Sequence, residues 1–140
     1  MGAFQEARVL FSLHATDIHP ISLDSTALRE KIDGVRAALE PAMDGRRIDL
    51  STLMTEAKGI TRETCSYFRL AGKLLQHGRL SSDSVQMIDN QIPGVHKFLQ
   101  AYSELIGEAR DNLKSEGKLS ASEDTLVKVY DLAKSLLISL

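Results

Sequence analysis

Five side chains of this sequence are the first candidates for metal binding or nucleophilic catalysis: Cys65, His14, His19, His77 and His96. A zinc site on a helix needs ligands three or four residues apart, as in H-E-x-x-H, because that spacing places them on one face. None of the histidines has another histidine or a glutamate at such a distance. We therefore predict no metal site and no cofactor, and we interpret His77 as a residue of a helix C-terminus.

Two histidines raise alternatives that the surrounding sequence argues against. Arg8 and His14 have the R-x5-H spacing that resembles the motif of HEPN-type ribonucleases, but here the spacing is N-terminal and the apolar run "VLFSL" fills it. His96 leaves room for two further helices, as a haem ligand would, yet no other residue supports a haem pocket. A phosphotransfer histidine needs a small residue four positions on, where His96 has Gln100.

A row of cations at helical spacing is the strongest binding candidate. Lys58, Arg62, Arg69 and Lys73 fall within a sector of roughly 60° at about 100° per residue, and the apolar residues of 53–75 centre about 160–200° away. These four residues, which we call the basic ribbon, extend over about 22 Å at 1.5 Å per residue. We predict that the basic ribbon binds a protein partner, an acidic or amphipathic helix, rather than a phosphate or an anionic headgroup.

The alternative interpretation is simply a solvated helix face, with Glu104, Glu108 and Asp111 of a neighbouring helix as candidate partners for its cations. Exposed ion pairs contribute at most about 1 kcal/mol each, so stability alone does not require such pairs.

Cys65 lies just beside the basic ribbon, where nearby cations would favour the reactive thiolate form. A nucleophile also needs a base and an orienting group, and the sequence indicates neither. There is also no glycine-rich phosphate loop and no G-x-S-x-G. We predict that the protein is not an enzyme, and an enzyme that uses Cys65 or a histidine is the third class of function considered.

The elements that must carry these residues are helices. Apolar residues recur at a spacing of three to four within 28–43, 53–75, 95–113 and 126–140. Gly45, Gly78 and Gly117 follow three of these stretches and suit the left-handed residue that ends a helix. Serines come next along the chain, and the predicted caps are Ser51, Ser81 or Ser82, and Ser120 with Glu123 as a capping box.

Proline and glycine interrupt the helical pattern at several positions. Pro93-Gly94 predicts a kink or a split in its helix, because proline lacks the N–H and clashes with the preceding turn. Gly34, Gly59, Gly72 and Gly107 lie inside helical stretches, where each costs about 1 kcal/mol relative to alanine. We interpret these glycines as points of close helix approach. The alternative is that some leave room for a ligand between helices.

The predicted fold is all-α: an antiparallel up-and-down helical bundle of four long helices plus an N-terminal segment. Residues 1–140 form one domain, with 1–23 as a separate N-terminal arm or a short helix. Apolar content of 43% and charged content of 26% are ordinary for a globular protein, and a net charge of −2 argues against nucleic acid as a partner.

The sequence also predicts where the protein acts. No apolar run approaches the roughly 20 residues of a membrane span, and the N-terminus lacks the pattern of a signal peptide. A single cysteine fits a reducing compartment. We expect a soluble, intracellular, cytoplasmic protein without a transmembrane segment.

The segment "AKGITRETCSYFRLAGKLL" (57–75) resembles a rod helix of the talin and vinculin type, and four long amphipathic helices are similar to focal-adhesion-targeting bundles. No functional residue is carried over from this resemblance. The leading hypothesis is a non-enzymatic protein–protein interaction module, an adaptor or scaffold that docks a partner helix or a second copy of itself as a homodimer. The alternative is a carrier or sensor of a small ligand or lipid, with an apolar cavity between the helices.

Overall fold

The computed structural model describes residues 23–140, which form four α-helices and no strand. The helices are α2 (Thr26–Met43), α3 (Leu50–Gln76), α4 (Ser82–Glu116) and α5 (Glu123–Ser139). The all-α class and the four long helices are thereby confirmed. The predictions for the N-terminal segment, including the Arg8–His14 spacing and His19, lie outside the described residues.

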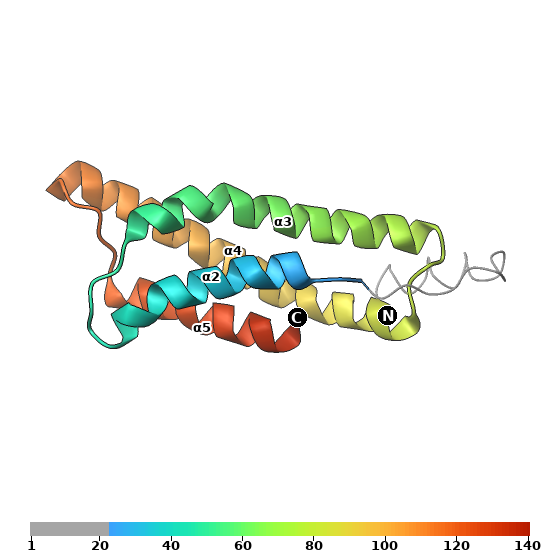
Figure 1. Cartoon of the computed structure of the whole chain (residues 1–140). Coiled ribbons are helices and arrows are strands. Elements are labelled where there is room, and N and C mark those ends of the chain that lie inside the picture. Colours follow the sequence, from blue (N-terminus) through green and yellow to red (C-terminus); the bar gives the residue numbers. More distant parts are fainter. Residues whose placement is uncertain (1–22) are drawn as a thin grey trace.

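The four helices pack as a ring in which each contacts two others (Figure 1). α2 packs against α3 and α5, and α4 packs against the same two helices. Helices that follow one another in the chain run in opposite directions, as short connections require (Figure 1). α3 and α4 are the least closely packed pair of the ring, a feature that matters for the surface described below.

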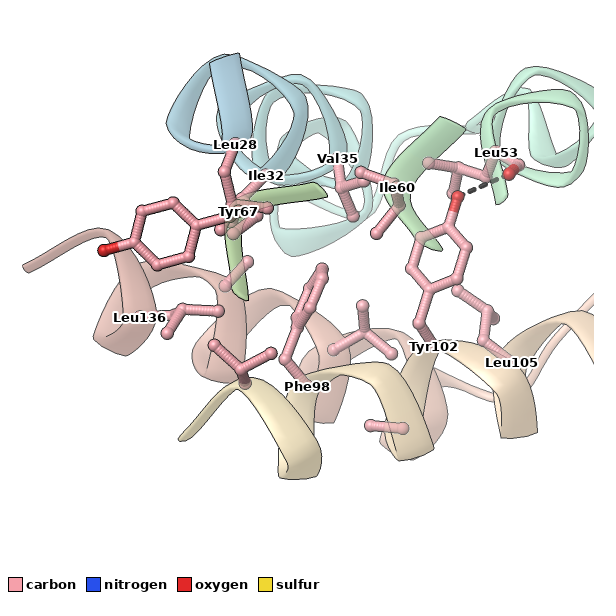
Figure 2. Packing of buried hydrophobic residues seen from close by; sticks show 14 of the residues in the cluster. Leu28, Ile32, Val35, Leu53, Ile60, Tyr67, Phe98, Tyr102, Leu105 and Leu136 are labelled. Atoms are coloured by element: carbon pink, nitrogen blue, oxygen red, sulfur yellow. Dashed lines mark hydrogen bonds between the residues drawn. The ribbon is translucent and has the colours of Figure 1, made fainter. Parts of the chain in front are cut away.

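One apolar core fills the space inside the ring (Figure 2). Leu28 and Ile32 of α2, Ile60 of α3, Phe98 of α4 and Leu136 of α5 are each at most 2% exposed. Burial of such side chains stabilises the fold by roughly 1.5–3 kcal/mol each, which is why the apolar periodicity predicts the helices. None of the described helices has the length and apolar character needed to cross a membrane.

The connections follow the predicted glycine pattern but not all of the predicted caps. Gly45, Gly78 and Gly117 have φ of 73°, 65° and 69°, the left-handed conformation that a side chain disfavours. Ser81 caps α4 as predicted, by accepting from the backbone N–H of Ser84.

Two of the predicted caps are wrong. Asp49 rather than Ser51 caps α3, and it accepts from the backbone N–H of Ser51 at 3.0 Å. Ser122 rather than Ser120 caps α5, because its hydroxyl accepts from the backbone N–H of Thr125 at 3.3 Å. The carboxylate of Glu108 in α4 also accepts from the backbone N–H of Ser122, at 2.7 Å, a contact between helices that no local sequence pattern contains.

Pro93 does not split its helix, since α4 continues from Ser82 to Glu116 through this residue. Ile88 and Gln91 are buried before the proline, and Val95 and Phe98 are buried after it. Packing on both sides of Pro93 holds the helix together and outweighs the local cost of the missing N–H.

Candidate partner-binding surface

α3 carries the basic ribbon because its two faces differ in chemistry. Leu53, Ile60 and Ala71 point into the core and are at most 2% exposed. The four ribbon residues lie on the opposite face, and all four are exposed. The cap at Asp49 and a last turn that contains Lys73 define a helix of 27 residues, long enough to carry the whole ribbon.

The basic ribbon has no acidic partner within residues 23–140. No carboxylate lies within ion-pair distance of any of its four cations, and none of the four takes part in a hydrogen bond or a ring contact that the described structure shows. The cations are spaced by four, seven and four residues, so two like-charged pairs stand one turn apart. Such pairs at i, i+4 destabilise a helix by roughly 0.2–0.5 kcal/mol each.

The acids expected to neutralise the basic ribbon are directed elsewhere. Glu104 forms an ion pair with Lys128 of α5, with 3.3 Å between Oε2 and Nζ. Glu108 accepts from the hydroxyl of Thr125 and from the backbone N–H of Ser122, and these bonds lower the pKa of its carboxyl. The expected pairing of the basic ribbon with α4 is therefore wrong for these two residues, whereas the interpretation as a solvated face does not depend on them. Asp111, its third member, forms no ion pair among the described residues.

Glu56, by contrast, lies on the opposite flank of α3 and faces α2. Its Oε2 is 3.2 Å from Nζ of Lys31. At about 100° per residue, Glu56 is roughly 160° around the helix from Lys58. The basic ribbon as a whole faces away from the core, and Lys58 is its member nearest to the side of α3 that packs against α4.

A groove between α3 and α4 adjoins this side of α3, and the sequence indicated such space only through the alternative interpretation of the mid-helix glycines. Its volume is about 520 Å³, and it is lined by Ala57, Ile60, Thr61, Leu99, Tyr102, Ser103, Ile106, Gly107 and Arg110. Tyr102 reaches across from α4 and donates its hydroxyl to the backbone carbonyl of Leu53 in α3 (Figure 2). Tyr102 also lines the groove, so this bond lies at the groove wall.

The interpretation of the mid-helix glycines as points of close approach is wrong for three of the four. A Cβ atom added to Gly34, Gly72 or Gly107 would meet nothing within 4 Å. Gly59 is the exception, with Nζ of Lys31 at 3.6 Å from such a Cβ. Gly107 lines the α3–α4 groove, and Gly34 lines a second cavity of about 290 Å³ between α2 and α3. The position of Gly107 inside a helical pattern was the one sequence signal for the groove.

The catalytic candidates that lie within residues 23–140 are not assembled into a site. Cys65 is an exposed free thiol, and no hydrogen bond joins it to His77 or His96, the two described histidines. His77 caps the C-terminus of α3, as its position in the sequence indicated. Within 23–140, no three His, Cys, Asp or Glu residues gather as metal ligands would.

Comparison with family models, with curated proteins and with solved structures finds no match to this chain. The resemblance of residues 57–75 to a talin- or vinculin-type rod helix accordingly remains a resemblance of helix pattern. The assignment of a function rests on the chain's own residues.

Proposed function

We propose that the protein is a non-enzymatic interaction module, an adaptor or scaffold that docks an acidic helix of a partner protein on the basic ribbon. The observation that carries this proposal is the row of four exposed cations without an acidic partner on one face of α3, within the described part of the chain. Like charges one turn apart lower the stability of the free helix, and opposite charges on a partner relieve this repulsion. Complementary charge also accelerates association and selects against the wrong partners.

A peptide selection tests the proposal and does not require the partner to be identified. A display library of random peptides of about 20 residues, each long enough to span 30 Å as a helix, is selected on the purified chain. Affinities of the enriched peptides are then measured against two variants. The first carries Lys58→Glu, Arg62→Glu, Arg69→Glu and Lys73→Glu. The matched control carries Arg47→Glu, Arg79→Glu, Lys97→Glu and Lys118→Glu, which replace exposed cations that form no ion pair with residues 23–140.

We expect enriched peptides with rows of Asp or Glu at helical spacing. Reversal of the basic ribbon should weaken their binding by more than about tenfold, or 1.4 kcal/mol, and the control reversal by much less. Both variants should keep the helical circular dichroism of the parent chain. Equal weakening by the two variants, or a failure to enrich any peptide, contradicts the proposal.

A small-ligand carrier is the second candidate, favoured by the cavity between α2 and α3. This cavity holds about 290 Å³, its apolar wall contains Val35, Ala38 and Leu53, and Gly34 leaves its mouth free of a side chain. Native mass spectrometry of the purified chain should then detect a bound molecule that a Gly34→Leu variant loses. A bare mass, together with no thermal shift across a lipid and metabolite panel, rejects this candidate.

A further inference from the structure

We infer that the groove between α3 and α4 holds the apolar side of the same partner helix. The partner is then an amphipathic helix in which a row of acidic residues runs beside a row of large apolar residues. This inference rests on the proposed function and adds to it the second half of the binding site, the position of the apolar anchor and the residues that accommodate it.

The groove and the basic ribbon are adjacent on the surface of α3. At about 100° per residue, the order around the helix from the core outward is Ile60, Ala57, Thr61, Lys58 and Arg62. The first three of these residues line the groove, and the last two belong to the basic ribbon. Lys58 lies only about 60° around α3 from Thr61, so a helix seated in the groove brings its flank to the cations.

The opposite wall of the groove carries a cation as well. Arg110 of α4 lines the groove, is exposed and forms no ion pair within the described part of the chain. On the same α4 wall, Leu99 and Ile106 supply apolar surface, and Gly107 adds no side chain. An apolar floor with positive charge on both sides matches an apolar ridge with negative charge on both sides.

The chemistry of this surface selects one class of occupant. A volume of about 520 Å³ is within the roughly 300–1,000 Å³ of pockets that bury ligand-sized apolar groups, so it can accept large side chains. Helix-in-groove recognition places such anchors at i, i+3, i+4 and i+7 on one face of the partner. A nucleic acid would use the cations but would place no aliphatic group on Leu99 and Ile106.

The spacing of the basic ribbon predicts where the apolar anchor lies. Intervals of four, seven and four residues read the same in both directions, so the charges alone do not set the direction of the partner helix. The groove, however, borders only the half of the ribbon that contains Lys58 and Arg62. The largest apolar side chain of the partner therefore lies beside the acids that meet these two residues, whichever direction the partner runs.

Filling the groove tests the inference. The acidic peptides enriched on the parent chain are measured against Gly107→Leu, which places a side chain in the groove, and against Gly34→Leu, which makes the same change at the other cavity. Neither glycine has an atom within 4 Å of an added Cβ, so both variants are expected to fold. Ser103→Leu is a second groove variant, and thermal unfolding of each variant checks its fold.

We expect Gly107→Leu and Ser103→Leu to weaken peptide binding by about tenfold or more, and Gly34→Leu to leave it nearly unchanged. Replacing the largest apolar residue of the peptide by alanine should weaken binding to the parent chain and have little further effect on Gly107→Leu. If ribbon reversal abolishes binding while both groove variants bind normally, the proposed function stands and this inference is wrong. If neither set of variants changes the affinity, both are wrong.

Two further results would also overturn the inference. One is preferential binding of single-stranded RNA or of anionic lipid vesicles, with an affinity that depends on the basic ribbon but not on Gly107. The other is a concentration-dependent dimer in light scattering that Gly107→Leu disrupts, because the groove would then hold a second copy of the chain.

Discussion

At the scale of single residues, Tyr102 joins the wall of the groove to the core. The residue is 3% exposed, and its hydroxyl donates to the backbone carbonyl of Leu53. Burial, and to a smaller extent the charge of Glu56, raises the pKa of the Tyr102 phenol. A raised pKa in the folded state means that this group contributes stability in full below about pH 10, the ordinary pKa of tyrosine, and loses it as the pH rises further.

We predict that Tyr102→Phe lowers the free energy of unfolding by about 1 kcal/mol at neutral pH, since the hydrogen bond to Leu53 is lost. The difference from the parent chain should shrink above about pH 10, where ionisation of this phenol in the unfolded parent lowers the parent's own stability. Denaturant unfolding at a series of pH values measures both effects. Tyr130→Phe is the control, and a difference for Tyr102→Phe that grows with alkaline pH would contradict the assignment.

The effect of replacing a glycine on stability depends on its backbone conformation and on the space at its Cβ position. Gly34 lies inside α2 with open space at its Cβ position, whereas Gly117 has φ of 69°. We expect Gly34→Ala to raise the free energy of unfolding by roughly 0.5–1 kcal/mol and Gly117→Ala to lower it by about 1 kcal/mol or more. Thermal and denaturant unfolding of the two variants provide the comparison. A loss of stability in Gly34→Ala would show that the site is more crowded than the structure indicates.

At the scale of elements, periodicity predicted the four helices, while the caps of α3 and α5 differ from the predicted ones. Ser120 followed by Glu123 is a proper capping-box pattern, yet Ser122 caps α5, and Glu108 of α4 accepts from the backbone N–H of this residue. A contact between residues 14 positions apart is invisible to a pattern that extends over four. Pro93 is a similar case, since burial on both sides of it overrides a local helix breaker.

The start of α5 provides a matched pair of variants. We expect Ser122→Ala to lower the free energy of unfolding by about 1 kcal/mol, because its hydroxyl accepts from the backbone N–H of Thr125. Ser120→Ala should have much less effect, since the described contacts of Ser120 involve only its backbone carbonyl, which accepts from Asn112. Chemical denaturation decides between the two serines, and a larger loss in Ser120→Ala would restore the cap that the sequence predicted.

α3 illustrates how far the candidate site could be predicted. The basic ribbon depends on the angle between residues of one helix, so the sequence alone predicts its exposure and its distance from the core. The groove depends on the separation of two helices, which the side chains of both determine together. Gly107 was noticed as an oddity, but Arg110 carried no signal at all.

Repulsion between the cations of the basic ribbon should lower the stability of α3, and this effect can be measured. We predict that Lys58→Gln with Arg69→Gln raises the free energy of unfolding at low salt by a few tenths of a kcal/mol, because each substitution removes one repulsion at i, i+4 and keeps Lys73 in the last turn of α3. Added salt should erase the gain by screening the charges of the parent chain. Destabilisation by these substitutions would mean that the cations have stabilising partners in the fold.

At the scale of the whole molecule, the arrangement of the helices makes the α3–α4 side of the bundle differ from its other sides. α2 and α5 close two sides of the bundle. Two acids of α4 are directed toward α5: Glu104 forms an ion pair with Lys128, and Glu108 accepts from the backbone N–H of Ser122. The α3–α4 seam is left with an apolar groove and with cations that no described acid neutralises. This combination of an apolar groove and neighbouring like charges is the basis of the proposed binding surface.

The most direct test of the proposed binding surface is a chemical-shift map of the isotope-labelled chain with the tightest acidic peptide from the selection. We expect the perturbed amides to cluster in α3 at 57–62 and in α4 at 99–110, with weaker changes toward Arg69 and Lys73. Perturbations that centre on α2 or α5, or that leave 99–110 unchanged, would contradict the proposed surface.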